Sequence, residues 1–179
     1  MRTHFLKLIE DEIKLAKRKK PAKIIIKLNS LVDQVLIGKL YEAAHFGVEI
    51  NLIIRGICCA ITRNKWFKQP INAISIVDEY LEHARIFVFF NGGQPKIYTS
   101  SADWMVRNLD HRVEAALPIL DPIVQQEILD MLNIELSGNV KARILDNKQR
   151  NKYVERHEDT PIIRSQFERY QYLKRQKYT

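Results

Sequence analysis

The sequence of 179 residues contains little cysteine and no long hydrophobic run. Its two cysteines, Cys58 and Cys59, are adjacent, which suits neither a disulfide between them nor the spacing of a zinc-binding pair. No apolar stretch approaches the ~20 residues that a membrane-spanning helix needs, and the first residues lack the pattern of a signal peptide. We therefore predict no disulfide framework, structural zinc site or membrane span, and expect a cytoplasmic location, free or peripheral to the membrane.

Short motifs of several common enzyme classes are also missing. The chain has no GxxxxGK[ST] loop, no GxGxxG segment and no HExxH segment, and no pair of acids is recognisably spaced for glycosidase chemistry. Nucleotide binding by a P-loop and catalysis by a zinc ion are therefore not supported.

Positive charge is abundant but unevenly distributed. The net charge is +8, from 29 basic and 21 acidic residues, with +4 in residues 1–20, +6 in residues 141–179 and −2 between them. Such an excess is typical of proteins with a polyanionic partner, such as nucleic acid, polyphosphate or an anionic membrane surface. The alternative interpretation is that both ends are solvated helical faces.

Hydrophobic periodicity and turn residues predict an α/β class, a mixed β-sheet flanked by α-helices in one domain. A strand, a helix and a strand with short connections over residues 23–54 indicate a right-handed βαβ unit with parallel strands, and Asn91-Gly92-Gly93 indicates a hairpin turn. The expected strands are 23–28, 48–54, 74–77, 85–90, 96–100, 113–120 and 141–145. We expect a first helix that ends at Pro21 and a second that is capped by Asn29-Ser30 and ends near Gly47. A brief helix is expected over 78–83, a further helix from Asp121-Pro122 to about Leu132, and a basic helix after Pro161.

Two basic clusters lie beside predicted strands. Arg55 follows the strand 48–54 and precedes Gly56, a combination that suits a phosphate because guanidinium binds oxyanions bidentately and glycine lets an anion approach the backbone. His83 precedes Arg85 by two residues, which on a strand would put both side chains on one face and make an anion site. In each case the alternative is an ordinary surface residue.

A third cluster is the polar run from Tyr98 to Glu114. Its hydroxyl residues Ser100 and Ser101 follow a strand and could offer hydrogen bonds to an anion, and Arg107 and Arg112 add positive charge. Within this run we expect Trp104 and Met105 to fill the core and His111 to have no special role.

Taken together, these clusters resemble the C-terminal domain of the polyphosphate kinases over nearly the whole chain. Many separate motifs occur in one order, which makes the resemblance specific. They are Lys27-Leu-Asn29-Ser-Leu-Val-Asp33, Ile54-Arg-Gly-Ile-Cys58, Ile74-Ser-Ile-Val-Asp78 through Leu81-Glu-His83, Asn91-Gly-Gly93, Ser100-Ser-Ala-Asp-Trp-Met105, Arg107-Asn108, Leu120-Asp-Pro122 and Val140-Lys-Ala-Arg143.

The resemblance implies a phospholipase-D-like fold and one domain, residues 1–179, of a longer enzyme that transfers the terminal phosphate of ATP reversibly to polyphosphate. It implies a phosphorylated histidine upstream of this chain, and magnesium held by residues outside it, so we assign no metal ligand here. Carried over residue by residue, it makes Arg55, His83 and, more weakly, Arg112 ligands of ATP and phosphate, with His83 also catalytic. The implied partners are ATP, ADP, polyphosphate, the enzyme's upstream domains and further copies of it, and not nucleic acid.

The sequence departs from the general phospholipase-D-like pattern. Arg85 stands where lysine is usual, Asp103 stands where asparagine is common, and the aspartate expected after the basic residue is absent. These departures argue against independent phosphodiesterase activity. A stand-alone phosphodiesterase or nuclease, and a non-catalytic module that binds polyanions, remain the alternative hypotheses.

Overall fold

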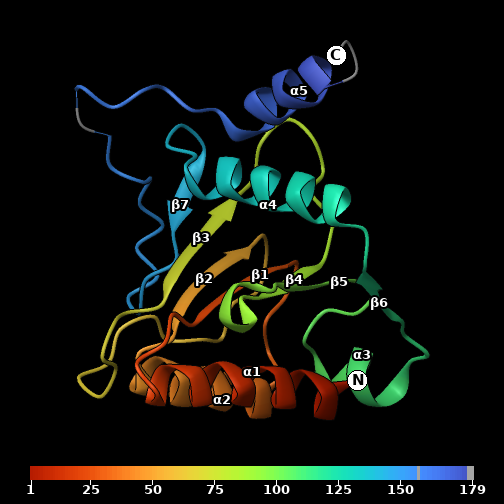
Figure 1. The fold of residues 1–179 in the computed structure, drawn as a ribbon. Coiled ribbons are helices and arrows are strands. Elements are labelled where there is room, and N and C mark those ends of the chain that lie inside the picture. The colour runs from red at the N-terminus through yellow and green to blue at the C-terminus, as the bar shows by residue number, and fades with distance from the viewer. Residues whose placement is uncertain (157, 177–179) are drawn as a thin grey trace.

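One mixed β-sheet organises the chain (Figure 1). The computed structural model describes residues 1–156 and 158–176, and within them the strand order is β6-β5-β4-β1-β2-β3-β7. The strands are β1 (Lys23–Leu28), β2 (Glu49–Ile54), β3 (Asn72–Ile76), β4 (Ile86–Phe89), β5 (Lys96–Ser100), β6 (Ala116–Ile119) and β7 (Ala142–Ile144). The helices are α1 (Arg2–Lys17), α2 (Gln34–Phe46), α3 (Val106–His111), α4 (Pro122–Leu136) and α5 (Ser165–Gln176), with a 3-10 turn over Asn91–Gly93.

The three central strands β1, β2 and β3 run parallel, which confirms the predicted βαβ unit. Strand β4 lies antiparallel to β1, with Ile86 opposite Lys27, and the predicted hairpin joins it to β5. As a result β1, β2 and β3 end, β4 begins and β5 ends at the same side of the sheet. We call this side the carboxyl edge, and the opposite side the amino edge. In open α/β sheets, ligands bind at the carboxyl ends of the strands.

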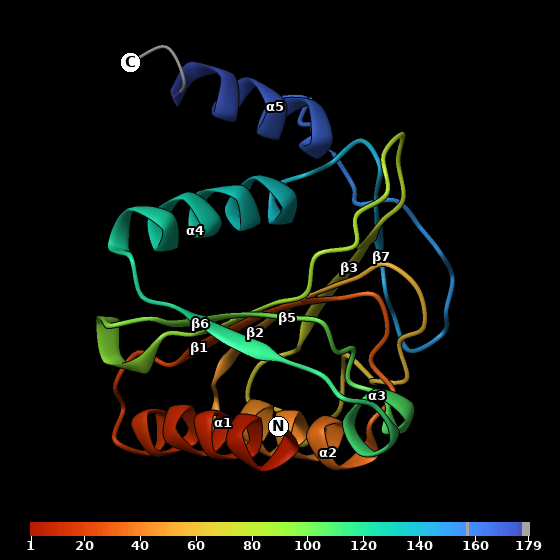
Figure 2. The same ribbon diagram turned by 90° about the vertical axis from the view of Figure 1, so that its right-hand side faces the viewer.

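Helices cover both faces of the sheet (Figure 2). α1 and α2 lie on one face, α4 lies on the other, and α5 packs outside α4. On the first face Phe5 of α1 contacts Phe87 of β4 with ring centroids 4.4 Å apart, and Phe87 stacks on Trp104 at 5.2 Å. All three rings are fully buried, so the prediction of Trp104 as a core residue is confirmed.

The predicted cap of the second helix is wrong. Asp33, not Asn29-Ser30, caps α2, because its Oδ1 accepts a hydrogen bond from the Leu36 amide at 3.0 Å. Residues 31–33 are held in an extended conformation by neighbouring backbone, with the Leu31 amide donating to the Ile57 carbonyl at 2.8 Å. Asn29 and Ser30 therefore lie at the carboxyl edge and are available to other partners.

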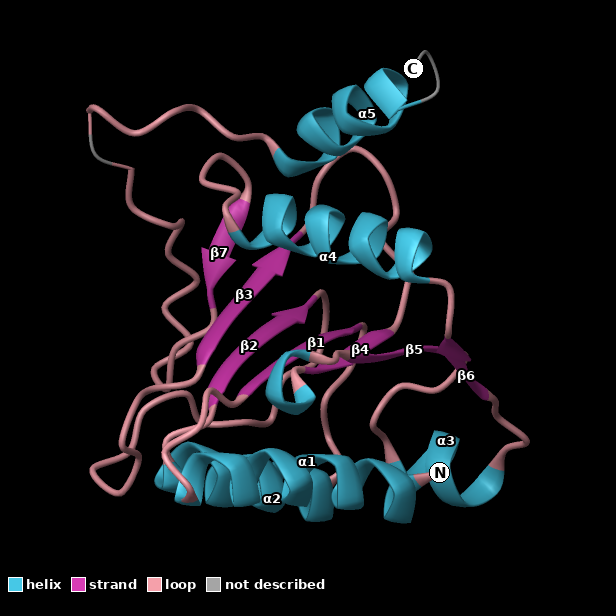
Figure 3. Cartoon of the chain, in the orientation of Figure 1, coloured by secondary structure: helices cyan, strands magenta, loops and turns pink. Residues whose placement is uncertain are grey.

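The brief helix predicted over 78–83 is also wrong. Residues 77–85, all of them described, form a loop between β3 and β4 without helix or strand (Figure 3). The backbone of Tyr80 in this loop pairs with the side chain of Gln166 rather than with a helical neighbour. Elsewhere the helix cap at Asp121 is confirmed, with its Oδ1 accepting from the Ile123 amide at 2.8 Å, and α4 continues four residues past the predicted end at Leu132.

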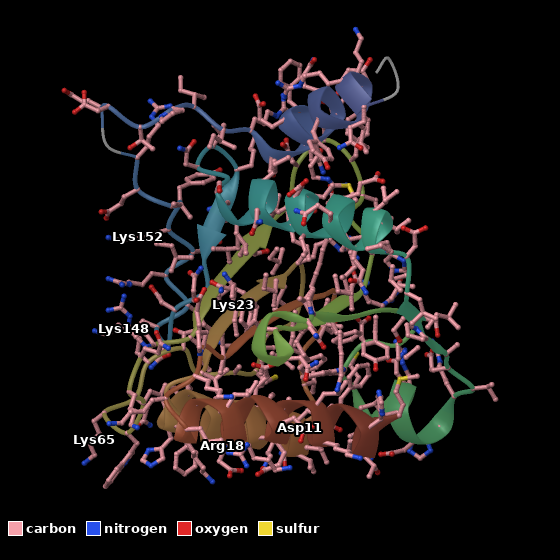
Figure 4. The ribbon with its side chains drawn as sticks, viewed as in Figure 1. Asp11, Arg18, Lys23, Lys65, Lys148 and Lys152 are labelled. Atoms are coloured by element: carbon pink, nitrogen blue, oxygen red, sulfur yellow. The ribbon has the colours of Figure 1, made fainter. Side chains whose placement is uncertain are left out.

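Several basic residues near the two ends of the chain lie away from the carboxyl edge. Arg18 follows α1 and precedes β1, so it lies at the amino edge. Lys148 and Lys152 follow β7, whose residue Ile144 pairs with Ile74 toward the amino end of β3, and they project outward from that segment (Figure 4). Among the described residues, no helix is long and apolar enough to cross a membrane.

Candidate functional site

Arg55 lies at the carboxyl edge, one residue past β2. Its Nε donates a hydrogen bond of 2.7 Å to Oδ1 of Asn29, one residue past β1, and its carbonyl accepts one from the Ser75 hydroxyl at 3.0 Å. Among the described residues, the two terminal nitrogens of the Arg55 guanidinium have no hydrogen bond or ion pair. Asn29 therefore orients the guanidinium through Nε and leaves its outer side available to an anion.

Gly56 allows the segments that follow β1 and β2 to approach closely. Its amide donates to the Asn29 carbonyl at 2.9 Å. A Cβ at this position would lie only 3.1 Å from the same carbonyl oxygen, tighter than most real Cβ contacts, so one of the two segments would have to shift. The predicted role of this glycine was close approach of an anion to the backbone, whereas in the structure the close neighbour is the backbone of Asn29.

Asp103 joins the Asn29 side of the edge to Arg85. Its Oδ1 accepts the backbone amides of Asn29 at 2.8 Å and Ser30 at 3.1 Å. Its Oδ2 accepts Nη2 of Arg85 at 3.1 Å, and both side chains of this ion pair are largely buried. Both carboxylate oxygens are therefore engaged, and the unusual Asp in the Ser-Ala-Asp motif holds the backbone after β1 in place.

His83 lies in the loop before β4 and not on the strand, so the expectation of two side chains on one strand face is wrong. The structure still brings the predicted pair together: the Arg85 guanidinium lies 3.4 Å from Nδ1 and 3.3 Å from Nε2 of His83. The imidazole is otherwise exposed. A chain of contacts thus runs along the edge from Arg55 through Asn29, Asp103 and Arg85 to His83.

This edge offers more donors than acceptors. Within the described part of the chain, Nδ2 of Asn29 and Nε of Arg85 are buried without a hydrogen-bond partner. Buried polar atoms without partners are uncommon in folded proteins. Together with the free side of Arg55, they make the site suited to an oxyanion, whose oxygens supply acceptors and negative charge.

Beneath the site lies a buried cluster of charges on four different elements. Nζ of Lys27 in β1 donates to Glu82 at 2.8 Å and to Glu135 of α4 at 2.6 Å, and Arg169 of α5 binds the same two carboxylates. A small cavity bordered by Lys27, Arg55, Glu82 and Glu135 connects this cluster to the site. Burial raises the pKa of Glu82, but hydrogen bonds and charge from Lys27 and Arg169 outweigh it and hold this pKa below its ordinary value.

Arg112 is exposed at the end of α3, and in the described structure it contacts neither Arg55 nor His83. Hydrogen bonds from Ser101 and Asn108 lower the pKa of the neighbouring Glu114, and the charges of Arg112 and Arg85 add to this effect. The Ser101 hydroxyl is engaged by Glu114 and the Ser100 hydroxyl by the Ala115 carbonyl. The prediction for this run was that the hydroxyls bind an anion. In the structure they form hydrogen bonds within the segment 100–115.

Sequence patterns alone do not identify several residues of this candidate site. Asn29 was interpreted as a helix cap, and Asp103 as a departure from a motif. Lys27 carries the clearest missed signal, since a lysine within the buried run Ile24-Ile-Ile-Lys-Leu28 requires a buried acidic partner.

Known proteins resemble this chain over nearly all of its length. A family model described as "Polyphosphate kinase C-terminal domain 2" matches residues 1–166. A polyphosphate kinase of Vibrio parahaemolyticus is 46% identical over 173 residues, which are 97% of this chain and 25% of that protein. A polyphosphate kinase of Escherichia coli K12 is 46% identical over 167 residues, 93% of this chain and 24% of that protein.

Solved structures give the same result for the fold. The crystal structure of polyphosphate kinase from Porphyromonas gingivalis superposes with a TM-score of 0.94 at 43% identity, over 98% of this chain and 27% of that one. NucT from Helicobacter pylori superposes with a TM-score of 0.50 at 11% identity, over 71% of this chain and 86% of that one. The second likeness shows the fold alone.

The fold and the edge therefore define an α/β domain of the phospholipase-D-like kind with a cationic, donor-rich site. The chain belongs to the polyphosphate kinase family, and it spans about a quarter of the length of the curated relatives that it matches.

Proposed function

We propose that residues 1–179 act as a single C-terminal domain of a longer polyphosphate kinase and supply part of its site for ATP and polyphosphate. The enzyme transfers the terminal phosphate of ATP reversibly to polyphosphate through a phosphohistidine upstream of this chain. One observation carries the proposal beyond family membership: Arg55, Asn29, Arg85 and His83 converge at the carboxyl edge with unpaired donors.

Each residue has a distinct role in this proposal. Arg55 binds phosphate oxygens with the free side of its guanidinium, in the bidentate manner typical of arginine. His83 faces the phosphohistidine, where it donates a hydrogen bond to the phosphate or moves a proton as the leaving group departs. Arg112 adds positive charge at the rim. Phosphoryl transfer depends mostly on positioning and on stabilising charge on the phosphate oxygens, which these groups are suited to do.

The donor set of this edge does not fit a magnesium ion. Magnesium prefers carboxylate, phosphate and water oxygens, whereas both oxygens of Asp103 are already bound to Arg85 and to backbone amides. In the proposal magnesium is held by residues outside this chain. The partners of the domain are the upstream domains of the enzyme and further copies of it.

Labelling with ATP that carries a radioactive terminal phosphate tests the proposal. We expect the complete enzyme to acquire label on a histidine outside this chain, and the isolated chain to acquire none. The isolated chain should also leave a model phosphodiester intact. Stable label on a histidine of this chain, or hydrolysis of the diester by it, would contradict the proposal and favour a stand-alone enzyme.

A further inference from the structure

The loop 77–85 carries His83, yet the sheet does little to hold it. It has no helix or strand, and Tyr80 and Leu81 are 69% and 71% exposed. A loop of this kind samples many conformations unless side chains anchor it. The position of His83 therefore depends on side-chain contacts that anchor the loop.

Those contacts come largely from α5 and the residue before it. Arg164 binds Asp78 with two hydrogen bonds, from Nε at 2.9 Å and from Nη2 at 2.8 Å, and reaches Glu79 at 3.0 Å. The Asp78 side chain is only 2% exposed. The beginning of the loop is thus fixed by a bidentate arginine–carboxylate pair.

Gln166 binds the middle of the loop through its backbone. Its Oε1 accepts the Tyr80 amide at 2.9 Å, and its Nε2 donates to the Tyr80 carbonyl at 2.8 Å and to Oε1 of Glu82 at 3.1 Å. One side-chain amide therefore satisfies both backbone groups of a single loop residue, as a neighbouring strand would.

The end of the loop is bound from two directions. Arg169 of α5 and Lys27 of β1 each donate to Oε2 of Glu82 at 2.8 Å. Glu82 directly precedes His83, and Lys27 lies two residues before Asn29. The same carboxylate therefore links α5 to the strand that bears the partner of Arg55.

α5 has its own attachment to the rest of the molecule. The Tyr172 hydroxyl donates to Oδ2 of Asp130 in α4 at 2.9 Å, and Ser165 is buried beside Gly138, at the end of α4. The helix can therefore act as a fixed support for the loop.

We propose that Arg164, Gln166 and Arg169 are positioning residues that hold His83 in its working place through the loop 77–85. This inference rests on the proposed function, in that His83 must act in phosphoryl transfer. Arg164 and Arg169 belong to the basic end of the chain, and in this role they bind carboxylates of the domain itself rather than a polyanion. The family model ends at residue 166, so its match leaves most of α5 outside.

The test uses the complete polyphosphate kinase with Gln166→Ala, Arg164→Gln and, as the control, Lys174→Ala, which changes an exposed residue of α5. Hydrogen–deuterium exchange of the peptide covering 77–85 should rise in the first two variants and stay unchanged in the control. The kcat for polyphosphate synthesis should fall about tenfold in the first two, since small displacements of a catalytic group are costly. Arg169 is left unchanged, because its loss would leave buried Glu135 paired with Lys27 alone.

A mutant cycle with His83→Ala separates positioning from general structural damage. If α5 acts through His83, Gln166→Ala should lower the remaining rate less than twofold in the His83→Ala enzyme. A tenfold loss in both backgrounds, unchanged exchange in Gln166→Ala, or faster exchange with a normal rate each overturns the inference. A normal rate from His83→Ala alone instead refutes the proposed role of His83, so the two failures are distinguishable.

Discussion

Asn29 Oδ1 accepts the Arg55 Nε–H at 2.7 Å, across the ends of two parallel strands. Asn29 is 6% exposed and its own backbone is bound by Asp103. The amide is therefore rigid, and the direction of the guanidinium is set before any anion arrives. The guanidinium is thus preorganised for an anion. Preorganised donors supply much of the rate enhancement of enzymes that transfer phosphate.

Asn29→Ala removes that acceptor and should lower kcat/KM for ATP about tenfold, the equivalent of one hydrogen bond to a charged group. Steady-state kinetics of the complete enzyme measures it. Asn72→Ala is the matched control, because Asn72 is an amide that binds another amide, Asn51, at 2.9 Å, but at the amino end of β3. Equal losses from both variants would show that Asn29 does not act through Arg55.

Gly56→Ala should destabilise the fold by about 1–3 kcal/mol, the usual cost of forcing atoms into a packed position. The new Cβ would lie 3.1 Å from the Asn29 carbonyl oxygen. Gly38→Ala, in the interior of α2, meets nothing within 4 Å and should instead stabilise the protein by about 0.5–1 kcal/mol. Urea unfolding of both variants tests whether the free energy of unfolding changes in opposite directions. No change in Gly56→Ala would mean that the backbone segments at this position can move apart to accommodate a Cβ.

Asp103→Asn should lower the free energy of unfolding by about 3 kcal/mol, because it leaves the buried Arg85 guanidinium without its counter-charge. As a comparison, Asp11→Asn breaks an exposed pair with Lys14 and should cost less than about 0.5 kcal/mol. Denaturant titration gives both values. Similar small decreases in the free energy of unfolding of the two variants would contradict a stabilising role of the Asp103–Arg85 ion pair.

The attachment of the loop 77–85 should weaken in acid. The Arg164 guanidinium, by hydrogen bonding and charge, holds the pKa of Asp78 below its ordinary value of 3.8. Because the pKa is lower in the folded state, the ion pair stabilises the fold fully above that ordinary value, and the effect disappears as pH falls through the folded pKa. The stability difference between wild type and Asp78→Asn should therefore narrow below about pH 4. Urea unfolding between pH 6 and 3 tests this, and a constant difference argues against it.

Local sequence patterns predict the strands and most helices well, because apolar periodicity and turn residues act over a few positions. The parallel pair of β1 and β2 and the hairpin after β4 are examples. The cap of α2 was misplaced because Asn29, Ser30 and Asp33 all have capping side chains, and the choice depends on backbone pairing of Leu31 with Ile57.

The site is less predictable, since its partners are distant in the chain. The residue types of Arg55 and His83 suit phosphate, and the family resemblance assigns both to the site, but neither indicates the groups that orient them. Lys27 and Glu135 are 108 positions apart, and no local pattern brings them together. For the same reason the basic end of the chain gave no sign that Arg169 binds Glu82.

In the proposed function Arg55 and His83 act directly on phosphate, and the rate of polyphosphate synthesis by the complete enzyme is the decisive test of this role. We predict that Arg55→Ala and His83→Ala each lower kcat/KM by about 10²–10³-fold, as loss of one contact to the reacting charge usually does. Arg63→Ala, which changes an exposed arginine in the loop before β3, should leave the rate unchanged. Near-normal rates from both Arg55→Ala and His83→Ala would contradict the proposed role of these two residues.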